Sequence, residues 1–456
     1  MPPVGELSGM AHLRTVGMGS LYVSPEGNDA WSGRLPAPNR AGTDGPLVTI
    51  AAALQRHPAR LLLRGGDYPP LCIAPAAAGC RLGAYPGERP VLAGVAIAAD
   101  DVRLDGIAVR GDVTVSGRGS LLYACRVGGR LTVSGRDHRV LAGVLAGGAL
   151  LAGDGLTLSD CLLRGGDAGV WIGGRDCRVR HNAMRGGLFG IALAAGAGAI
   201  IEHNVITGAG IGLWLCRAWP GTRVTGNVIR RAGIGMHAAG CAAILFEDNL
   251  VEADLAYRQR GGRDNLLRNN SLSGGIACAA PGPIRPAILD GNLLRGCRGW
   301  DDRALARRNS RLAAVGAALR EDDPALACGF GPLDPALAGP RLASVLPRSA
   351  DDWPEEPESP TPAVRCRLRA AGQGAFTLTV ENCGSVPAAG DVALRVTPAG
   401  AGALRGEEAL PYALLPGESA EWSGAVAITP GCGRLLLETL PRGEGILPTA
   451  VYLVGV

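Results

Sequence analysis

The chain contains no lysine, so all 45 of its basic residues are arginine. No lysine side chain is present to act as a base or to form a Schiff base, which excludes lysine-dependent catalysis. Aromatic residues are also scarce, at 4% of the 456 residues, and no apolar segment is long enough to span a membrane as a helix. The net charge of +4 is too small to predict a nucleic-acid partner.

Cys-x-x-Cys motifs are absent, although the chain has 13 cysteines. The odd number leaves at least one cysteine unpaired within the chain, and the scattered positions favour reduced cysteines that pack as small apolar residues. We therefore predict no metal site and no cofactor. Residues 1–20 lack the apolar run and the small-residue cleavage pattern of a signal peptide, so the sequence leaves the location of the protein open.

Glycine is abundant, with 70 residues, and apolar residues make up 47% of the chain. The apolar content predicts a folded protein. So much glycine argues against a helical bundle and favours an all-β fold that is rich in turns.

Six asparagines recur at steps of 22, 23, 22, 21 and 22 residues, and Asp160 lies one further step of 22 upstream. A fixed period in this range is typical of a solenoid. Short apolar strands precede and follow each asparagine, which predicts a bend at that point because asparagine tolerates left-handed backbone. The six residues are Asn182, Asn204, Asn227, Asn249, Asn270 and Asn292.

Asparagine at every coil also has a chemical reason. Coils that stack at the strand spacing of about 4.8 Å would bring the amides within hydrogen-bonding distance of one another. Stacked carboxylates would instead repel. We therefore predict a ladder of asparagine side chains along the solenoid.

The N-terminal part carries a second motif. Residues 21–50 read LYVSPEGNDAWSGRLPAPNRAGTDGPLVTI, and Gly66-Asp67-Tyr68 and Ala84-Tyr85-Pro86-Gly87-Glu88-Arg89-Pro90-Val91-Leu92 follow. A strand, a turn and a short helix near residues 47–56 would form a cap, which an open solenoid end needs.

This opening resembles that of right-handed parallel β-helix proteins of the pectate-lyase-like class, among them secreted polysaccharide lyases and glycosidases. The resemblance covers residues 21–295. It implies a right-handed parallel β-helix, for which the repeat length gives about ten coils between residues 95 and 295. It also implies an extracytoplasmic protein that acts on or binds a polysaccharide or oligosaccharide, and it leaves the oligomeric state open.

One strand of each coil can be phased from the sequence, and we refer to it as strand one. It recurs as Val113–Val115, Leu131–Val133 and Ala149–Leu151, and we expect it to continue through Val170–Ile172, Ile191–Leu193, Ile211–Leu213 and Ile234–Met236. Period-two alternation then predicts which side chains point outward. They are Trp171, Ala192, Trp214, His237 and Arg258.

The outward face of strand one is the predicted ligand site, because the resemblance implies a sugar-binding groove there. Aromatic rings stack on sugars and guanidinium groups bind carboxylates. The substrate-binding candidates are Trp171, Trp214, Arg217, Trp219 and Tyr257, the last three in adjoining turns. The catalytic candidates are His237 or Arg258 for proton transfer, with Glu252 or Asp254 as partner. The alternative is that each of these side chains simply covers the flank of the solenoid.

A second cluster of polar residues flanks the asparagine bend. His181 and His203 stand one coil apart, with Glu202, Glu247 and Asp248 near them. Two histidines with carboxylates suit a metal, as in the β-helix proteins that help mature periplasmic copper enzymes. The alternative, which we favour, is a column of solvated polar residues.

Several motifs of β-helix enzymes are missing. Strand one shows neither the carboxylates of polygalacturonases nor the calcium-binding acids of pectate lyases, and the Asp-Pro-His-Asp motif of uronate epimerases is absent. The sequence thus leaves two functions open. One is a lyase or glycosidase for an acidic polysaccharide, and the other is a non-catalytic glycan-binding, structural or accessory protein.

The C-terminal part differs in pattern. Residues 301–320 read as an arginine- and alanine-rich helix, and residues 349–362 are an acidic, proline-rich linker. Beyond them, six or seven short alternating strands predict a small Ig-like β-sandwich. We therefore divide the chain into a tail (1–20), a β-helix with its caps (21–348), the linker and a sandwich (363–456).

Overall fold

The computed structural model describes residues 19–295 with gaps at 165–166, 195–197, 219 and 280–286. It also describes residues 310–312 and 338–341 and the strands between residues 364 and 454.

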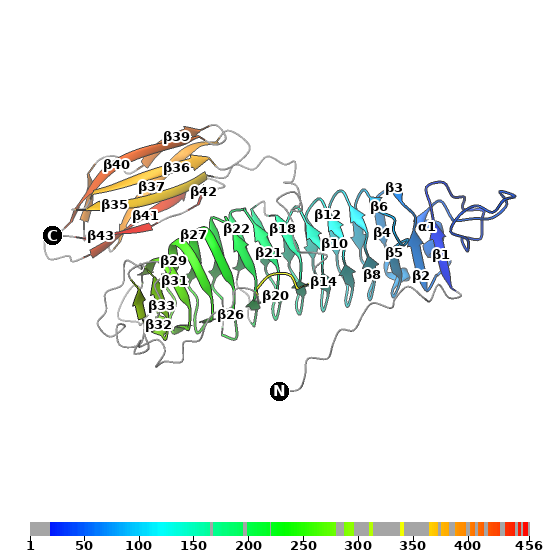
Figure 1. The fold of residues 1–456 in the computed structure, drawn as a ribbon, viewed down its shortest axis with the longest axis horizontal. Coiled ribbons are helices and arrows are strands. Elements are labelled where there is room, and N and C mark those ends of the chain that lie inside the picture. Colours follow the sequence, from blue (N-terminus) through cyan, green and yellow to red (C-terminus); the bar gives the residue numbers. More distant parts are fainter. Residues whose placement is uncertain are drawn as a thin grey trace.

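The N-terminal part is a solenoid in which each coil contributes one strand to each of three rows of parallel strands (Figure 1). The first row, sheet A, has 13 strands. They are β1 (Ser20–Val23), β2 (Arg60–Leu63), β5 (Arg81–Ala84), β8 (Arg103–Asp105), β11 (Leu121–Tyr123), β14 (Arg139–Leu141), β17 (Thr157–Ser159), β20 (Arg178–Arg180), β23 (Ile200–Glu202), β26 (Arg223–Thr225), β28 (Leu245–Glu247), β30 (Asn265–Arg268) and β32 (Ala287–Asp290).

The other two rows form one hydrogen-bonded network, because three long strands run through both. These strands are β27 (Val228–Ala239), β29 (Leu250–Arg260) and β31 (Ser271–Ala279). The row after the asparagine bend, sheet B, also contains β3 (Gly66–Tyr68), β6 (Pro90–Leu92), β9 (Ala108–Val109), β12 (Arg126–Val127), β15 (Val144–Leu145), β18 (Leu162–Arg164), β21 (Ala183–Arg185), β24 (Val205–Thr207), β33 (Leu293–Arg295) and β34 (Ser310–Leu312).

The third row, sheet C, is the predicted strand one. Its strands are β4 (Leu71–Ile73), β7 (Val95–Ile97), β10 (Val113–Val115), β13 (Leu131–Val133), β16 (Ala149–Leu151), β19 (Ala168–Ile172), β22 (Phe189–Ala194), β25 (Ile211–Cys216) and the second parts of the three long strands. Ten strands of sheet A, β8 to β32, lie in the span 95–295. The predicted parallel solenoid of about ten coils is thereby confirmed.

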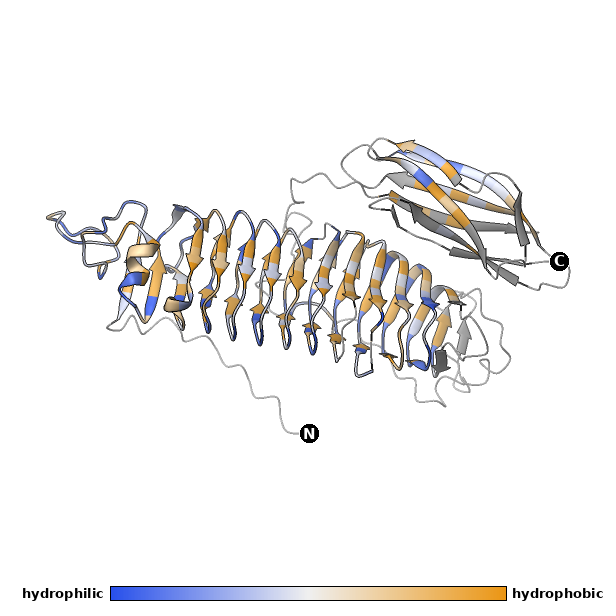
Figure 2. Ribbon diagram, turned by 180° about the vertical axis from the view of Figure 1, so that it is seen from behind, coloured by the Kyte–Doolittle hydropathy of each residue, from blue (hydrophilic) through white to orange (hydrophobic). Residues whose placement is uncertain are grey.

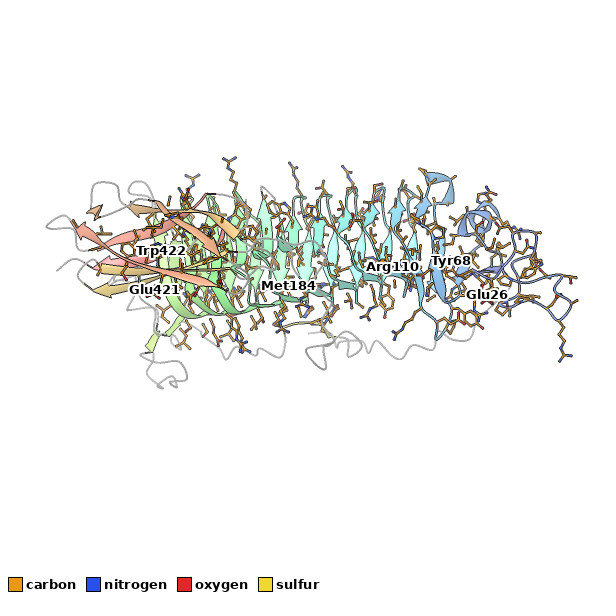
Figure 3. All side chains as sticks on the ribbon, turned by 90° about the horizontal axis from the view of Figure 1, so that it is seen from above. Glu26, Tyr68, Arg110, Met184, Glu421 and Trp422 are labelled. Atoms are coloured by element: carbon orange, nitrogen blue, oxygen red, sulfur yellow. The ribbon has the colours of Figure 1, made fainter. Side chains whose placement is uncertain are left out.

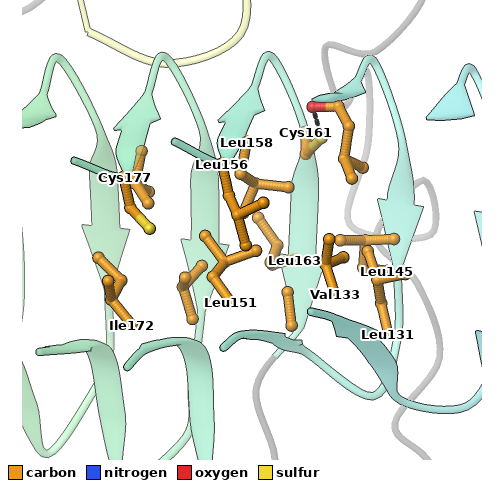
Figure 4. Packing of buried hydrophobic residues seen from close by; sticks show 14 of the residues in the cluster. Leu131, Val133, Leu145, Leu151, Leu156, Leu158, Cys161, Leu163, Ile172 and Cys177 are labelled. Atoms are coloured by element: carbon orange, nitrogen blue, oxygen red, sulfur yellow. Dashed lines mark hydrogen bonds between the residues drawn. The ribbon is translucent and has the colours of Figure 1, made fainter. Parts of the chain in front are cut away.

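The interior of the solenoid is filled by aliphatic side chains from all three rows. Alternate residues point inward, so apolar residues line up one above another at each level (Figure 2). A close view shows Leu131, Val133 and Leu151 of sheet C facing Leu145 and Leu163 of sheet B (Figure 4). Long side chains project from the flanks instead (Figure 3), and Arg110 on one of them pairs with Asp67 at 2.8 Å.

The asparagine ladder is confirmed. All six side chains are fully buried. The amide of Asn182 donates to the side-chain oxygen of Asn204 at 3.0 Å, and the same bond links every following pair up to Asn292. From Asn204 onward, each side-chain oxygen also accepts the backbone N–H of the asparagine one coil earlier, as between Asn204 and Asn227 at 3.0 Å. The ladder therefore joins six successive bends by both backbone and side-chain bonds.

The left-handed backbone at the bend belongs to the residue before each asparagine, not to the asparagine itself. His181 and His203 have φ of 53°, and Asp160 has φ of 57°. Asp160 thus aligns with His181, and the residue that aligns with Asn182 is Cys161. The backbone N–H of Cys161 donates to Asn182 Oδ1 at 2.9 Å, and its sulfur accepts from the N–H of Gly143 at 3.3 Å. A buried thiol therefore ends the ladder.

The predicted N-terminal cap is present. Helix α1 (Ile50–Gln55) begins after Thr49, whose hydroxyl accepts the N–H of Ala52 at 3.1 Å. Its buried Ile50 and Ala53 belong to the interior core. A 3₁₀ turn, η1 (Pro75–Ala77), lies between β4 and β5.

The helix predicted over residues 301–320 is wrong at its centre. Residues 310–312 form β34, which pairs in parallel with β33. The open edge of sheet B offers unpaired backbone groups, and their pairing outweighs the helical preference of this stretch. The rest of the predicted helix and the linker at 349–362 lie outside the described residues.

Residues 338–341 cross the outer side of the asparagine bend, far in sequence from the coils that they touch. The N–H of Gly339 donates to the carbonyl of His203 at 2.7 Å. The guanidinium of Arg341 binds the Asp160 carboxylate at 2.9 and 2.7 Å, and its backbone N–H donates to the same group at 3.0 Å. We refer to these four residues as the strap.

The C-terminal part consists of two sheets with a core of their own, antiparallel except for one short parallel pair. One has five strands, β38 (Gly402–Arg405), β40 (Ser419–Ile428), β36 (Ala375–Asn382), β35 (Val364–Gly372) and β42 (Ile446–Leu447). The other has four strands, β39 (Ala409–Leu414), β37 (Ala388–Thr397), β41 (Arg434–Arg442) and β43 (Ala450–Val454). The antiparallel C-terminal region is confirmed, with nine described strands rather than six or seven.

We predict that residues 362–456 fold by themselves. The reason is the separate core of this region, which includes Val380, Val392 and Leu437. An isolated fragment should give a dispersed amide NMR spectrum and a cooperative thermal transition. If the fragment aggregates when it is produced without the solenoid, this domain boundary is wrong.

Candidate functional site

The predicted outward row of strand one exists in the structure. The register pairs Leu150 with Trp171, Trp171 with Ala192, Ala192 with Trp214, Trp214 with His237 and His237 with Arg258. The expected triplets are shifted in the later coils, because Ile191 pairs with Leu213 rather than with Ile211, and Leu213 in turn pairs with Met236. The shift of two residues leaves the outward assignment unchanged.

Three aromatic rings gather on this face. The ring centroids of Trp171 and Trp214 lie 5.8 Å apart, and Phe189 contacts both, stacked on Trp214 at 5.2 Å and edge-on to Trp171 at 6.4 Å. All three side chains are half-buried. We refer to them as the ring cluster. Phe189 was not among the predicted residues, because it stands at the start of its strand and outside the aligned triplet.

The ring cluster rests on a small apolar cluster that is separate from the interior core. Its buried members are Ile211, Ile234, Leu255 and Ala277. Glycine is required behind it, since a Cβ at Gly212 would lie 2.6 Å from Ile229 Cγ2 on sheet B. Sheet B and sheet C therefore approach each other closely at this level, which leaves the aromatic side chains on the outer surface.

His237 and Arg258, the predicted proton-transfer groups, are buried, with exposed fractions of 7% and 4%. Neither ring nitrogen of His237 has a hydrogen-bond partner among the described residues. Burial, with Arg258 and Arg260 nearby, lowers the pKa of His237 to about 3. The imidazole is therefore neutral at physiological pH.

The predicted acid partners are not joined to His237. Glu252 lies on the sheet B part of β29 and forms an ion pair with Arg230, one coil earlier, at 3.6 Å. Asp254 lies two residues further on and is exposed. The structure thus brings Trp171, Trp214, His237 and Arg258 into one row and leaves the two acids on the neighbouring part of the strand.

The remaining candidates have different environments. Arg217 is exposed just after β25. Tyr257 was predicted in a turn beside the face, but it is fully buried in strand β29 and packs edge-on against Phe246 at 5.5 Å. Its hydroxyl donates to Gln259 at 2.8 Å. The alternation that points Arg258 outward points its neighbour Tyr257 inward, so Tyr257 cannot contact a surface ligand. Trp219 lies outside the described residues.

The histidine column at the asparagine bend is formed as the spacing predicted. The rings of His181 and His203 are stacked, with centroids 5.1 Å apart and an angle of 14° between them. His181 Nδ1 is buried, and no described residue bonds to it. Burial lowers the pKa of His181, and the guanidinium of Arg341 lowers it further. Among the described residues, no group of three or more potential metal ligands occurs.

The strap keeps the Asp160 carboxylate of the neighbouring coil ionised. Burial by itself raises the pKa of Asp160, but the hydrogen bonds from Arg341 and Ser159 outweigh it and hold the pKa at about 2. The ion pair is therefore charged at all ordinary pH values, and it anchors the strap beside the histidines.

The eight cysteines whose side chains the structure describes are all free thiols. Burial raises the pKa of Cys125 and Cys161 to about 12. Both pack as small buried residues, as the sequence predicted, and Cys161 in addition ends the asparagine ladder. The described helices include none that could cross a membrane.

The parallel coils, the asparagine ladder and the capped N-terminal opening decide the fold class. The protein is a right-handed parallel β-helix. The sequence model of the family described as "Periplasmic copper-binding protein (NosD)" matches residues 106–280 of this β-helix. The matched span contains the ladder from Asn182 to Asn270, both stacked histidines and the ring cluster. It covers less than half of the chain, so it is a similarity and not a family assignment.

Solved structures similar to the β-helix include carbohydrate-active proteins. A XylC–xylose complex is 10% identical with a TM-score of 0.42, and the alignment covers 89% of this chain and 100% of that one. The periplasmic alginate epimerase AlgG is 10% identical with a TM-score of 0.35, covering 56% and 77%. Pectate lyase Pel9A is 14% identical with a TM-score of 0.32, covering 60% and 79%. No curated protein matches the chain. At these levels of similarity, none of these structures bears on the activity of this β-helix.

Proposed function

We propose that this β-helix is a glycan-binding protein whose ligand lies along the outer face of sheet C. The observation that carries the proposal is the ring cluster, in which Trp171, Phe189 and Trp214 present half-buried rings from three successive coils. Aromatic faces of this kind stack on the apolar faces of sugar rings. Successive coils lie about 4.8 Å apart, so the rings form a row along the solenoid axis that an extended oligosaccharide can follow.

Charged groups near the cluster support an acidic or polar glycan. Arg217 is exposed three residues after Trp214, where its guanidinium can bind a carboxylate or hydroxyl groups. Trp219 follows Arg217 in the sequence by two residues, and its predicted role in binding the substrate stays a prediction.

The environment of His237 supports binding rather than cleavage. A proton-transfer group must reach the substrate within hydrogen-bonding distance and have a pKa near the working pH. His237 is instead buried, and its pKa is about 3. Its predicted partner Glu252 is paired with Arg230. His237 and Arg258 remain the groups to substitute if cleavage is found.

The test is a panel of uronate and neutral polysaccharides, assayed for binding and for new reducing or unsaturated ends. We expect binding without new ends. New ends that disappear in His237→Ala would establish the lyase or glycosidase instead, and no binding to any member of the panel would reject the proposal.

A second function, copper binding, is favoured by the stacked histidines within the span that matches the copper-binding family. Imidazole nitrogens suit copper, and His181 Nδ1 is a buried nitrogen with no partner among the described residues. The residues that would hold the ion are His181 and His203. The nearby guanidinium of Arg341 opposes a cation, so this site fits less well than the ring cluster fits a sugar.

We predict that His181→Ala and His203→Ala each weaken any Cu(II) binding by at least about tenfold. Each substitution removes one of the two imidazole nitrogens that would bind the ion. Calorimetric titration of the full chain measures the effect, and His57→Ala is the matched control at a left-handed position outside the column. Equal affinity in wild type and both variants would remove copper binding at this pair.

A further inference from the structure

A groove lies on a different sheet and at the other end of the solenoid. It is a hollow of about 700 Å³ on the outer side of sheet A, over β2, β5, β8 and β11. None of the residues predicted to bind a ligand lines it. Its lining combines arginines, tyrosines and two acids, and we refer to it as the arginine groove.

Arginines occupy one position of the groove at three successive coils. Arg81 pairs with Arg103 in the sheet register, and Arg60 precedes the paired residues Leu61 and Leu82 in the same row. Neighbouring members of the row are therefore separated by one strand spacing, about 4.8 Å. Three like charges at this spacing repel unless they are neutralised.

Only part of this charge is neutralised within the described structure. Arg103 pairs with Asp105 at 2.8 Å. Glu88 is held by Arg64, which donates to both carboxylate oxygens at 3.0 and 2.9 Å. Arg60 and Arg81 are exposed, and neither forms an ion pair with a described residue. The groove therefore holds two adjacent guanidinium groups without an anion.

Tyrosines flank the arginines. Tyr85 is half-buried and held in place, with the Arg64 guanidinium 4.7 Å from its ring centroid and Tyr22 against it at 6.1 Å. Tyr123, also half-buried, lines the groove two coils further on. In the row between them, Gly83 pairs with Leu62 and Asp105 and contributes no side chain.

We propose that the arginine groove binds an acidic oligosaccharide, a chain of hexuronate residues. Arg60 and Arg81 bind carboxylates of successive sugars, and Tyr85 and Tyr123 contact the sugar rings. A hexuronate chain carries one carboxylate on each ring, and the length of a ring is comparable with the strand spacing. Charge-assisted guanidinium–carboxylate bonds at this spacing therefore match the repeat of the ligand.

The lining argues against a nucleic acid. Glu88 and Asp105 are part of the groove and would repel a backbone with dense phosphate charge. The net charge of the chain, +4, is also small. A hexuronate chain, with one charge to each ring, is less densely charged than a nucleic-acid duplex and is repelled less by these two acids, which favours the saccharide.

The experiment is calorimetric titration of the full chain with hexuronate oligosaccharides and with neutral oligosaccharides of equal length. It uses the Trp214→Ala background, so that failure of the ring cluster as a site does not affect the result. We expect Arg81→Gln to weaken hexuronate binding about tenfold and Arg60→Gln/Arg81→Gln about a hundredfold, with neutral sugars unaffected. Tyr85→Leu should weaken hexuronate and neutral sugars alike.

The matched control is Arg139→Gln, because Arg139 is exposed in the same row of sheet A but does not line the groove. Equal losses in Arg139→Gln and Arg81→Gln would show unspecific attraction and overturn the proposal. So would hexuronates that bind no tighter than neutral sugars. If single-stranded DNA or an acidic peptide binds to the same arginines more tightly than hexuronates do, the proposal of a saccharide ligand is overturned in favour of that class of ligand.

Discussion

Asn227→Leu should lower the free energy of unfolding by about 3 kcal/mol or more, since each buried polar group that loses its partner costs about 1–3 kcal/mol. The side-chain oxygen of Asn227 accepts the backbone N–H and the amide of Asn204, both at 3.0 Å. Its own amide donates to Asn249 at 3.0 Å and to the carbonyl of Ile201 at 2.9 Å. Leucine satisfies none of these groups, and the site is fully buried, so water cannot replace the asparagine.

Denaturant unfolding followed by circular dichroism measures this loss. Thr225→Leu is the matched control, because Thr225 lies two residues earlier in the same coil and is only half-buried. It should stay within about 0.5 kcal/mol of wild type. Asn227→Asp should also destabilise, since the carboxylate keeps the acceptor but loses the donor and buries a charge. Wild-type stability in Asn227→Leu would mean that the ladder is not needed for the fold.

The solenoid could be predicted because its evidence is local and repeated. One asparagine in each of six successive coils fixes the period, and alternation within short strands fixes which side chains point outward. The same alternation predicts the correct direction for the Tyr257 side chain. Tyr257 directly precedes the outward Arg258 in the strand, so it must face inward. Reading β29 as a turn and not as part of a strand of 11 residues led to the wrong prediction.

The environment of the candidate site could not be predicted in the same way. A register shows the direction of a side chain but not what covers it, so the burial of His237 and its low pKa were not evident. The bond between Arg341 and Asp160 joins residues 181 positions apart and follows no repeat. The row of Arg60, Arg81 and Arg103 was missed because the first coils vary in length and contain no ladder residue to phase them.

Trp214→Ala should weaken glycan binding on the order of thirtyfold, which corresponds to about 2 kcal/mol for one large aromatic side chain buried by a ligand. Trp214 contacts both other rings of the cluster, Trp171 at 5.8 Å and Phe189 at 5.2 Å between centroids. Its removal takes away the largest stacking surface and also the support for the Phe189 ring. Trp171→Ala should have a smaller effect, since the stacked pair of Phe189 and Trp214 stays intact.

Two further variants separate binding from folding. Trp214→Phe keeps a flat ring over the apolar cluster that contains Ile211 and Ile234, so it should retain most of the affinity and the thermal stability. Leu150→Ala changes a half-buried side chain in the same outward row, before the rings begin, and should bind as wild type does. If Trp214→Ala folds and binds with unchanged affinity, the ligand does not lie on the ring cluster. If binding is lost while wild type never produces new chain ends, the face is a binding surface, because the rings that hold the glycan then act without any group that cleaves it.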